Sequence, residues 1–311
     1  MIVLEINNQT YRVYAAWHEI TVKKAREVYS IAIKLPDELD VIYKETSRPD
    51  PDNDQIRIYT EQLTNKLDEL HAYWFKCIEA LSDIPLEVLK QTNINDVEVL
   101  YKRFIEPFIF GMLYFPVNGV DDMSSFTLMG ESYFCPESEN IMGTDRPFAN
   151  EVAAVYCDAS DVDANCRKQG NKYGMAELIT AIIYREKGEA YNDREALRVA
   201  DRYKDILTVD IFHSALLQLS KTNSTLQKLF PNLYQKGNRK SSSAAEQSGL
   251  NDFGWLNSIM TVAEMGVLNQ KEKTPLESVR QTNLYNFMTV LSNLRAGSDF
   301  QRIFSEQNKK K

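Results

Sequence analysis

Glycine, histidine and cysteine are scarce in this chain. Its 311 residues include 12 glycines, 3 histidines and 4 cysteines. Neither GxGxxG nor GxxxxGK followed by Ser or Thr occurs, so the sequence offers no glycine-rich loop to hold nucleotide phosphates. The cysteines (Cys77, Cys135, Cys157 and Cys166) lack CxxC spacing, which favours reduced structural thiols over a disulfide framework or a zinc site. The sequence therefore predicts no cofactor and no metal.

Excess positive charge and long hydrophobic runs are also missing. The chain has 36 basic and 44 acidic residues, a net charge of −8, and its basic clusters are confined to Lys236–Lys240 and Lys309–Lys311. Because phosphate binding needs a positive face, this balance argues against nucleic acid as the partner. The longest apolar stretch, Phe104–Val117, is broken by a glutamate and two prolines and is too short to span a bilayer. With no signal-peptide pattern at the start, we expect no membrane association and a cytoplasmic location.

The titratable residues form no catalytic pattern. His213 and Ser214 are adjacent, and neighbours on a helix diverge by about 100°, so they cannot act as a base and its nucleophile. Asp158, Asp161 and Asp163 could bind a hard cation, but the stretch lacks the glycine turn and distal glutamate of an EF-hand loop. A solvated acidic helix face is the alternative. We expect no catalytic residue and no enzymatic activity.

Apolar periodicity predicts a mostly α protein with a small N-terminal β-hairpin. Residues 2–6 and 10–14 alternate apolar and polar side chains around an Asn-rich turn, as hairpins do. Thr21 can cap a helix with an apolar face, and we expect the hairpin to pack across this helix with Trp17 filling the hinge. A long helix is predicted from about 56 to 81 and a further one from 95 to about 112, kinked at Pro107.

Changes in composition divide the chain into five segments. Residues 235–249 contain no large apolar side chain, which predicts a flexible linker that tethers the helices beyond it. The C-terminal helices are expected at 252–267 and 276–294, with a short segment at 299–306. The predicted segments are a hairpin plus helical region (1–114), a loop-rich connection with one hairpin (115–147), a helical bundle (148–234), the linker (235–249) and a C-terminal helical module (250–311).

Aromatic side chains are plentiful, with 16 Tyr, 14 Phe and 3 Trp. Tyr and Trp are enriched at protein–protein contacts because they offer a large area at a small entropic cost. The candidate partner-binding residues are Phe253, Trp255 and Met260, in the predicted C-terminal module. The alternative is that these three side chains fill a local core.

Three stretches together resemble one known family. The first stretch, residues 17–23 (WHEITVK), follows the hairpin. The second consists of residues 178–185 (LITAIIYR) and 187–191 (KGEAY), which precede a helix at 198–207. In the third, Gly254-Trp255 opens a helix ahead of residues 290–294 (VLSNL). This order of features is similar to that of the tail assembly chaperones of tailed bacteriophages, especially phages of Bacteroides-like hosts. Residues 35–150 depart from the family pattern as a long insert.

The resemblance implies a non-enzymatic helical protein that acts in the host cell cytoplasm. Members of that family coat the tape measure protein during tail assembly, recruit tail-tube subunits, and leave before the particle matures. Two alternatives stay open: a permanent virion component (tail, connector or cargo protein) and an enzyme of unrecognised helical fold. Whether the chain forms an oligomer is also left open.

Overall fold

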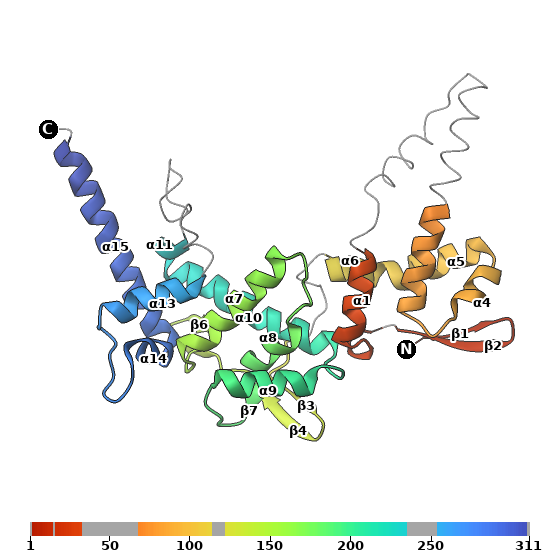
Figure 1. Ribbon diagram of the computed structural model, residues 1–311, viewed down its shortest axis with the longest axis horizontal. Helices are drawn as coiled ribbons and strands as arrows, with labels where there is room; N and C mark the ends of the chain where they lie inside the picture. The colour runs from red at the N-terminus through yellow and green to blue at the C-terminus, as the bar shows by residue number, and fades with distance from the viewer. Residues whose placement is uncertain (1, 15, 33–67, 114–121, 235–253, 310–311) are drawn as a thin grey trace, which may run out of the picture. The chain divides into compact units, whose positions relative to one another are not determined.

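The computed structural model describes residues 2–14, 16–32, 68–113, 122–234 and 254–309 (Figure 1). These residues form mainly helices, together with small antiparallel sheets, the first of which is an N-terminal hairpin. The predicted fold class, mostly α with a small N-terminal β-hairpin, is therefore confirmed. Contacts divide the chain into two compact units, Met1–Val120 with Lys204–Asp210, and Asp121–Tyr203 with Ile211–Lys311.

The hairpin of the first unit pairs β1 (Ile2–Ile6) with β2 (Gln9–Val13). Asn7 and Asn8 form its two-residue turn with φ of 53° and 61°, a conformation that asparagine tolerates better than most residues. The hairpin docks on the residues that follow the helix over 68–80. The Tyr14 amide donates to the Leu81 carbonyl at 3.1 Å and the Asp83 amide to the Arg12 carbonyl at 3.0 Å. These backbone bonds attach the hairpin to residues 81–83, and the Tyr11 and Val13 side chains of the hairpin are buried.

The first helix, α1 (Val22–Ala32), begins where the sequence predicts. The Lys24 amide donates to the Thr21 hydroxyl at 3.3 Å, which supplies the N-terminal cap. Trp17 lies in the 3₁₀ turn η1 (Trp17–Glu19), with its ring at 4.7 Å and edge-on to Phe108. The buried face of α1 consists of Val22, Ala25, Val28 and Ala32.

The predicted kink at Pro107 takes the form of a widened turn. The elements after the helix over 68–80 are α4 (Leu86–Gln91), α5 (Ile94–Leu100), the π-helical η2 (Tyr101–Ile105) and α6 (Glu106–Leu113). The Glu106 amide donates to the Tyr101 carbonyl, five residues back, at the junction with α6. Proline has no amide hydrogen and its ring collides with the carbonyl four residues earlier, so a π turn just before Pro107 relieves both problems.

The second unit begins with strands. β3 (Ser125–Leu128), β4 (Glu131–Phe134) and β7 (Arg185–Glu186) form one sheet, and β5 (Glu139–Ile141) pairs with β6 (Thr144–Arg146). The β3–β4 hairpin is the one predicted in the loop-rich stretch. The β5–β6 hairpin was not predicted, because its strands are three residues long and contain a single large apolar residue. Both hairpins turn at a Met-Gly pair with positive φ at each residue.

Helix α7 is the hub of the second unit, since it contacts α8, α13, α14 and α15. The helices are α7 (Ala153–Lys168), α8 (Ala176–Ile183), α9 (Asp193–Tyr203), α10 (Val209–Leu229), α11 (Pro231–Tyr234), α13 (Trp255–Glu264), α14 (Pro275–Arg280) and α15 (Leu284–Lys309). The C-terminal helices thus belong to the same compact unit as residues 121–203, which differs from the separate module expected. The linker predicted at 235–249 lies outside the described residues.

The helix predicted at 276–294 is divided into α14 and α15. Asn283 starts the second helix, since its side-chain oxygen accepts from the Tyr285 amide at 3.0 Å. Helix α15 then continues through the short segment predicted at 299–306. In the part of the chain that the structure describes, no helix combines the length and apolar character that crossing a membrane requires.

Candidate protein-binding surface

The three candidate partner-binding residues have different positions. Phe253 lies outside the described residues. Trp255 begins α13, and its ring lies edge-on to Tyr156 at 5.6 Å and to Phe287 at 6.4 Å, between α7 and α15. Met260, on the same helix, is 47% exposed. Trp255 therefore contributes to a local core, whereas Met260 is available at the surface.

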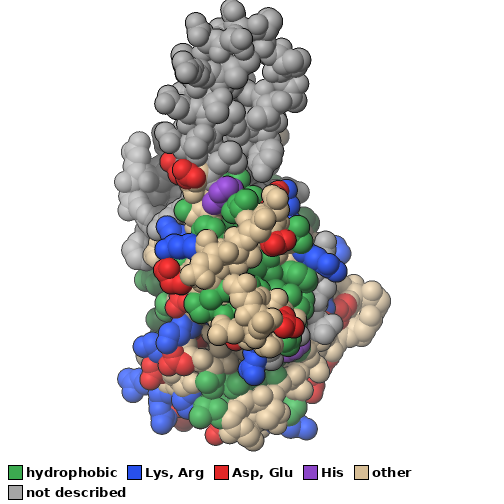
Figure 2. Space-filling view, turned by 90° about the vertical axis from the view of Figure 1, so that its right-hand side faces the viewer, with side chains coloured by type: hydrophobic (Ala, Val, Ile, Leu, Met, Phe, Trp, Pro, Cys, Tyr) green, Lys and Arg blue, Asp and Glu red, His purple; other side chains and the backbone are tan. Residues whose placement is uncertain are grey.

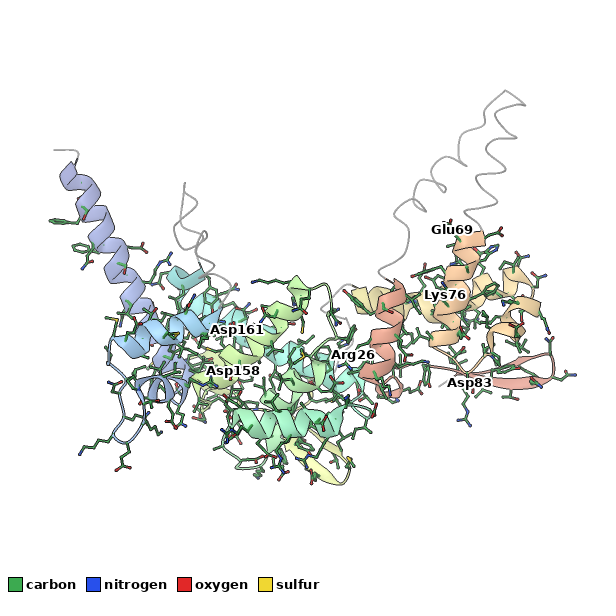
Figure 3. The ribbon with its side chains drawn as sticks, in the orientation of Figure 1. Arg26, Glu69, Lys76, Asp83, Asp158 and Asp161 are labelled. Atoms are coloured by element: carbon green, nitrogen blue, oxygen red, sulfur yellow. The ribbon has the colours of Figure 1, made fainter. Side chains whose placement is uncertain are left out.

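Asp161 of α7 holds the N-terminus of α13. Both carboxylate oxygens accept the Trp255 amide at 3.0 Å, at a helix end whose amides have no intrahelical partner (Figure 3). Gly254 permits this approach, because it has φ of +53° and a Cβ there would lie 2.2 Å from Asp161 Oδ1. Burial raises the pKa of Asp161, although hydrogen bonding from the Trp255 amide opposes the rise. This contact fixes the start of α13 against α7.

Asp158, one turn earlier on α7, holds α14. Arg280 donates to both Asp158 oxygens, at 3.0 and 2.8 Å, in a bidentate pair. The same guanidinium reaches Asp193 at the start of α9 at 2.8 Å, and Tyr191 donates to Asp158 at 2.6 Å. Burial disfavours the charged guanidinium, but the bonds and charge of Asp158 outweigh it, so the pKa of Arg280 is raised. The network joins α7, α9 and α14 at a half-buried site.

These contacts correct the interpretation of the acidic residues on α7. Asp158 binds Arg280, Asp161 caps α13, and Asp163 accepts from Arg167 at 2.8 Å. The three carboxylates are therefore neither a cation site nor a freely solvated face. Among the described residues, no group of three or more His, Cys, Asp or Glu side chains is placed to hold a metal ion.

The helices that α7 holds carry several exposed apolar side chains. Phe300 is 69% exposed and Phe304 is 56% exposed, and their rings stack with centroids 6.2 Å apart. The sequence predicted a separate short segment at 299–306, and this prediction did not identify the pair. The spacing of four residues between the two phenylalanines indicates that they lie on the same side of a helix. The other exposed apolar residues from α13 to α14 are Leu256, Met260, Met265, Val267 and Leu276. Figure 2 views the molecule from the side of α4, α5 and the β1–β2 hairpin instead, and on that face hydrophobic side chains are interspersed with charged ones of both signs.

A small recess lies between α8 and α9. Its lining includes Tyr133, Tyr184, Arg185 and Tyr191, and it encloses a volume of about 10 Å³, room for roughly one water molecule. Small-molecule sites generally enclose about 300–1,000 Å³ and bury most of the ligand, so this recess falls short of them. Arg185 is also occupied, since its guanidinium pairs with Glu151 at 2.5 Å. The recess therefore gives little support to a ligand site.

A polar cluster lies in the core of the same unit. His213 is fully buried and its Nε2 lies 3.0 Å from the Tyr173 hydroxyl. Burial, together with the positive charge of Lys172, lowers the pKa of His213 to about 3. Burial also lowers the pKa of Lys172 to about 8. The histidine is thus held neutral inside the protein, in a structural setting.

The candidate surface has two features, a set of contacts that fixes its helices and a set of apolar side chains exposed on them. Carboxylates of α7 fix α13 and α14 in place, and these helices, with α15, present apolar side chains to solvent. Comparison with known proteins adds nothing to this description, because no protein-family model, curated protein or solved structure matches the chain.

Proposed function

We propose that this chain is a non-enzymatic bacteriophage assembly protein that binds a long helical partner, such as a tape measure protein, during tail assembly. The observation that carries the proposal is the set of apolar side chains that α13 and α15 expose, including Leu256, Met260 and Phe300. Burial of apolar area contributes about 25 cal/mol per Å². A partner helix that covers these side chains therefore gains affinity by the usual helix-to-helix mode of recognition.

The sequence resemblance supports the same function. The stretch at residues 17–23 forms η1 and the entry into α1, and residues 178–185 form most of α8 and the start of β7. Their likeness to tail assembly chaperones adds tail-tube subunits as further partners. It also favours action in the host cell cytoplasm and departure before the particle matures.

Co-expression with the tape measure protein of the same phage tests the proposal. We expect the two chains to co-purify through an affinity tag on either one and to elute together in size-exclusion chromatography. Replacing Leu256 and Met260 by Ser should weaken this complex. The matched control is Leu197→Ser, which removes an apolar side chain that is 56% exposed on α9. Absence of a complex with the unaltered chain contradicts the proposal.

Quantitative mass spectrometry separates an assembly chaperone from a permanent virion component. A chaperone should be abundant in infected-cell lysate and absent from purified particles. Stoichiometric presence in particles would instead assign the chain to the virion itself, as a tail, connector or cargo protein. In both cases the exposed apolar side chains bind another phage protein. The two results differ in whether this binding ends before the particle matures or persists in the virion.

A further inference from the structure

Two methionines of the second unit, Met129 and Met142, occupy strained turn positions. Each of these turn methionines is the first turn residue of a hairpin, with φ of 53°, and each is followed by a glycine that also has positive φ. Such two-residue turns favour Asn, Asp or Gly at the first position, because a longer side chain in the left-handed region crowds the backbone. Methionine therefore weakens both turns relative to asparagine.

Neither side chain offsets this cost by packing. Met129 is 78% exposed and Met142 is fully exposed. What the two residues present to solvent is a thioether sulfur on a flexible, unbranched side chain. The feature that these turns add to the surface is thus a chemical group rather than a contact within the fold.

The other described methionines are less accessible than the turn methionines. Met175, Met260 and Met265 are 44%, 47% and 53% exposed, Met123 is half-buried and Met288 is fully buried. Oxidation of a thioether requires the oxidant to reach the sulfur, so exposure ranks the rates at which these residues react. The turn methionines come first in this order.

The cysteine thiols compete poorly for the same oxidant. Cys77, Cys157 and Cys166 are buried, and Cys135 is half-buried. The pKa of Cys77 and the pKa of Cys135 are both raised to about 12, mainly by burial. The thiolate is the form that attacks peroxides, and little of it exists at neutral pH when the pKa is so high. The accessible sulfur of the described residues is therefore methionine sulfur.

We propose that Met129 and Met142 form a peroxide modification site, at which limiting oxidant is consumed before it reaches Met260 of α13 and Met265 just after it. The sulfur lone pair attacks one oxygen of hydrogen peroxide as the O–O bond breaks. The proton of the transferred hydroxyl passes to the departing hydroxide, which leaves as water. The thioether loses two electrons and becomes a sulfoxide, a form that methionine sulfoxide reductases convert back to methionine.

The position of the oxidised residue decides what the modification changes. A sulfoxide oxygen on a turn methionine enters solvent and disturbs no packing, because both side chains are exposed. The same oxygen on Met260 or Met265 would place a polar group among the exposed apolar side chains of the candidate surface. Oxidation at the turns thus leaves that surface apolar.

Limiting hydrogen peroxide followed by quantitative peptide mass spectrometry tests the rate order in the full-length chain. We expect each turn methionine to be oxidised at least about twofold faster than Met260 and Met265, while Met288 and the cysteines stay reduced. The matched control is the same chain in concentrated urea, where all methionines should react at similar rates. Equal rates in the folded chain, or the same rate order in urea, would overturn the inference.

Met129→Asn with Met142→Asn tests whether the turns protect the candidate surface. Asparagine favours this turn, so circular dichroism should show an intact fold. Under the same limiting peroxide, oxidation of Met260 and Met265 should rise about twofold, and Met175→Leu, which removes a less exposed methionine, should give a smaller rise. Unchanged oxidation of Met260 and Met265 contradicts the proposed protection. A double variant that fails to fold leaves the decision to the rates in the unaltered chain.

This inference is independent of the proposed function, because both measurements use the chain without a partner. Failure to capture a tape measure protein would leave the oxidation order unchanged. Equal oxidation rates would leave the capture experiment unchanged.

Discussion

Replacing Gly254 by Ala should strongly destabilise the second unit. The residue has φ of +53° and ψ of −131°, a region that only glycine adopts readily, so strain of about 1–3 kcal/mol is expected. The new Cβ would lie 2.2 Å from Asp161 Oδ1, so the carboxylate has to move and release the Trp255 amide. Loss of such a cap costs about 1–2 kcal/mol. The combined effect is about 3 kcal/mol.

Urea unfolding followed by tryptophan fluorescence and far-UV circular dichroism measures this free energy. Asp161→Ala alone should cost about 1–2 kcal/mol, because it removes the cap without straining the backbone. In the double variant the Cβ meets no carboxylate, so Gly254→Ala should cost about 1–2 kcal/mol less than it does in the unaltered chain. A Gly254→Ala protein within about 0.5 kcal/mol of the unaltered one, or equal costs in both backgrounds, would refute the reasoning.

Three further predictions concern stability. The pKa of His213 is about 3 in the folded protein, against an ordinary value of 6.5, so between these pH values only the unfolded chain binds this proton. The free energy of unfolding therefore falls as the pH drops from 6.5 toward 3. In acid titrations, His213→Gln should make this fall shallower by about 1 kcal/mol per pH unit. Arg280→Lys cannot keep the bidentate pair with Asp158, so chemical denaturation should show a free energy of unfolding that is lower by about 2 kcal/mol. An unchanged denaturation midpoint would contradict a stabilising role for this pair. Asn8 has φ of 61°, which glycine adopts easily and alanine does not, so Asn8→Gly should preserve or raise the melting temperature. Asn8→Ala should lower the melting temperature, because the free energy of unfolding falls by about 1 kcal/mol.

Elements with a strong local signal were predicted well. Thr21 predicted the start of α1, and Val22, Ala25 and Val28, which form the predicted apolar face, are among its buried side chains. The β3–β4 hairpin followed from the alternation of apolar and polar side chains in residues 124–134, and the structure adds that its turn lies at Met129-Gly130. Such signals suffice because a helix or a two-residue turn depends on side chains within a few positions of one another.

The candidate site was harder to predict because its contacts join distant residues. Asp161 meets Trp255 across 94 positions, and Asp158 meets Arg280 across 122. An acidic helix face has the same sequence pattern whether its carboxylates face water or an arginine side chain. The sequence analysis therefore interpreted the α7 carboxylates as either a solvated face or a cation-binding cluster. Trp255 was offered as a binding residue for the same reason, since an aromatic residue at a helix start can face inward or outward.

Sequence alone determined the class of the fold, the start of α1 and the absence of familiar nucleotide-binding motifs, because composition and periodicity are properties of short stretches. Tertiary structure decided which acidic residues are bound, that the Trp255 ring contacts Tyr156 and Phe287, and that α15 continues past Leu294 to expose Phe300 and Phe304. Those outcomes depend on which surfaces meet in space. A carboxylate or an aromatic ring acquires its role from neighbours that lie far away along the chain.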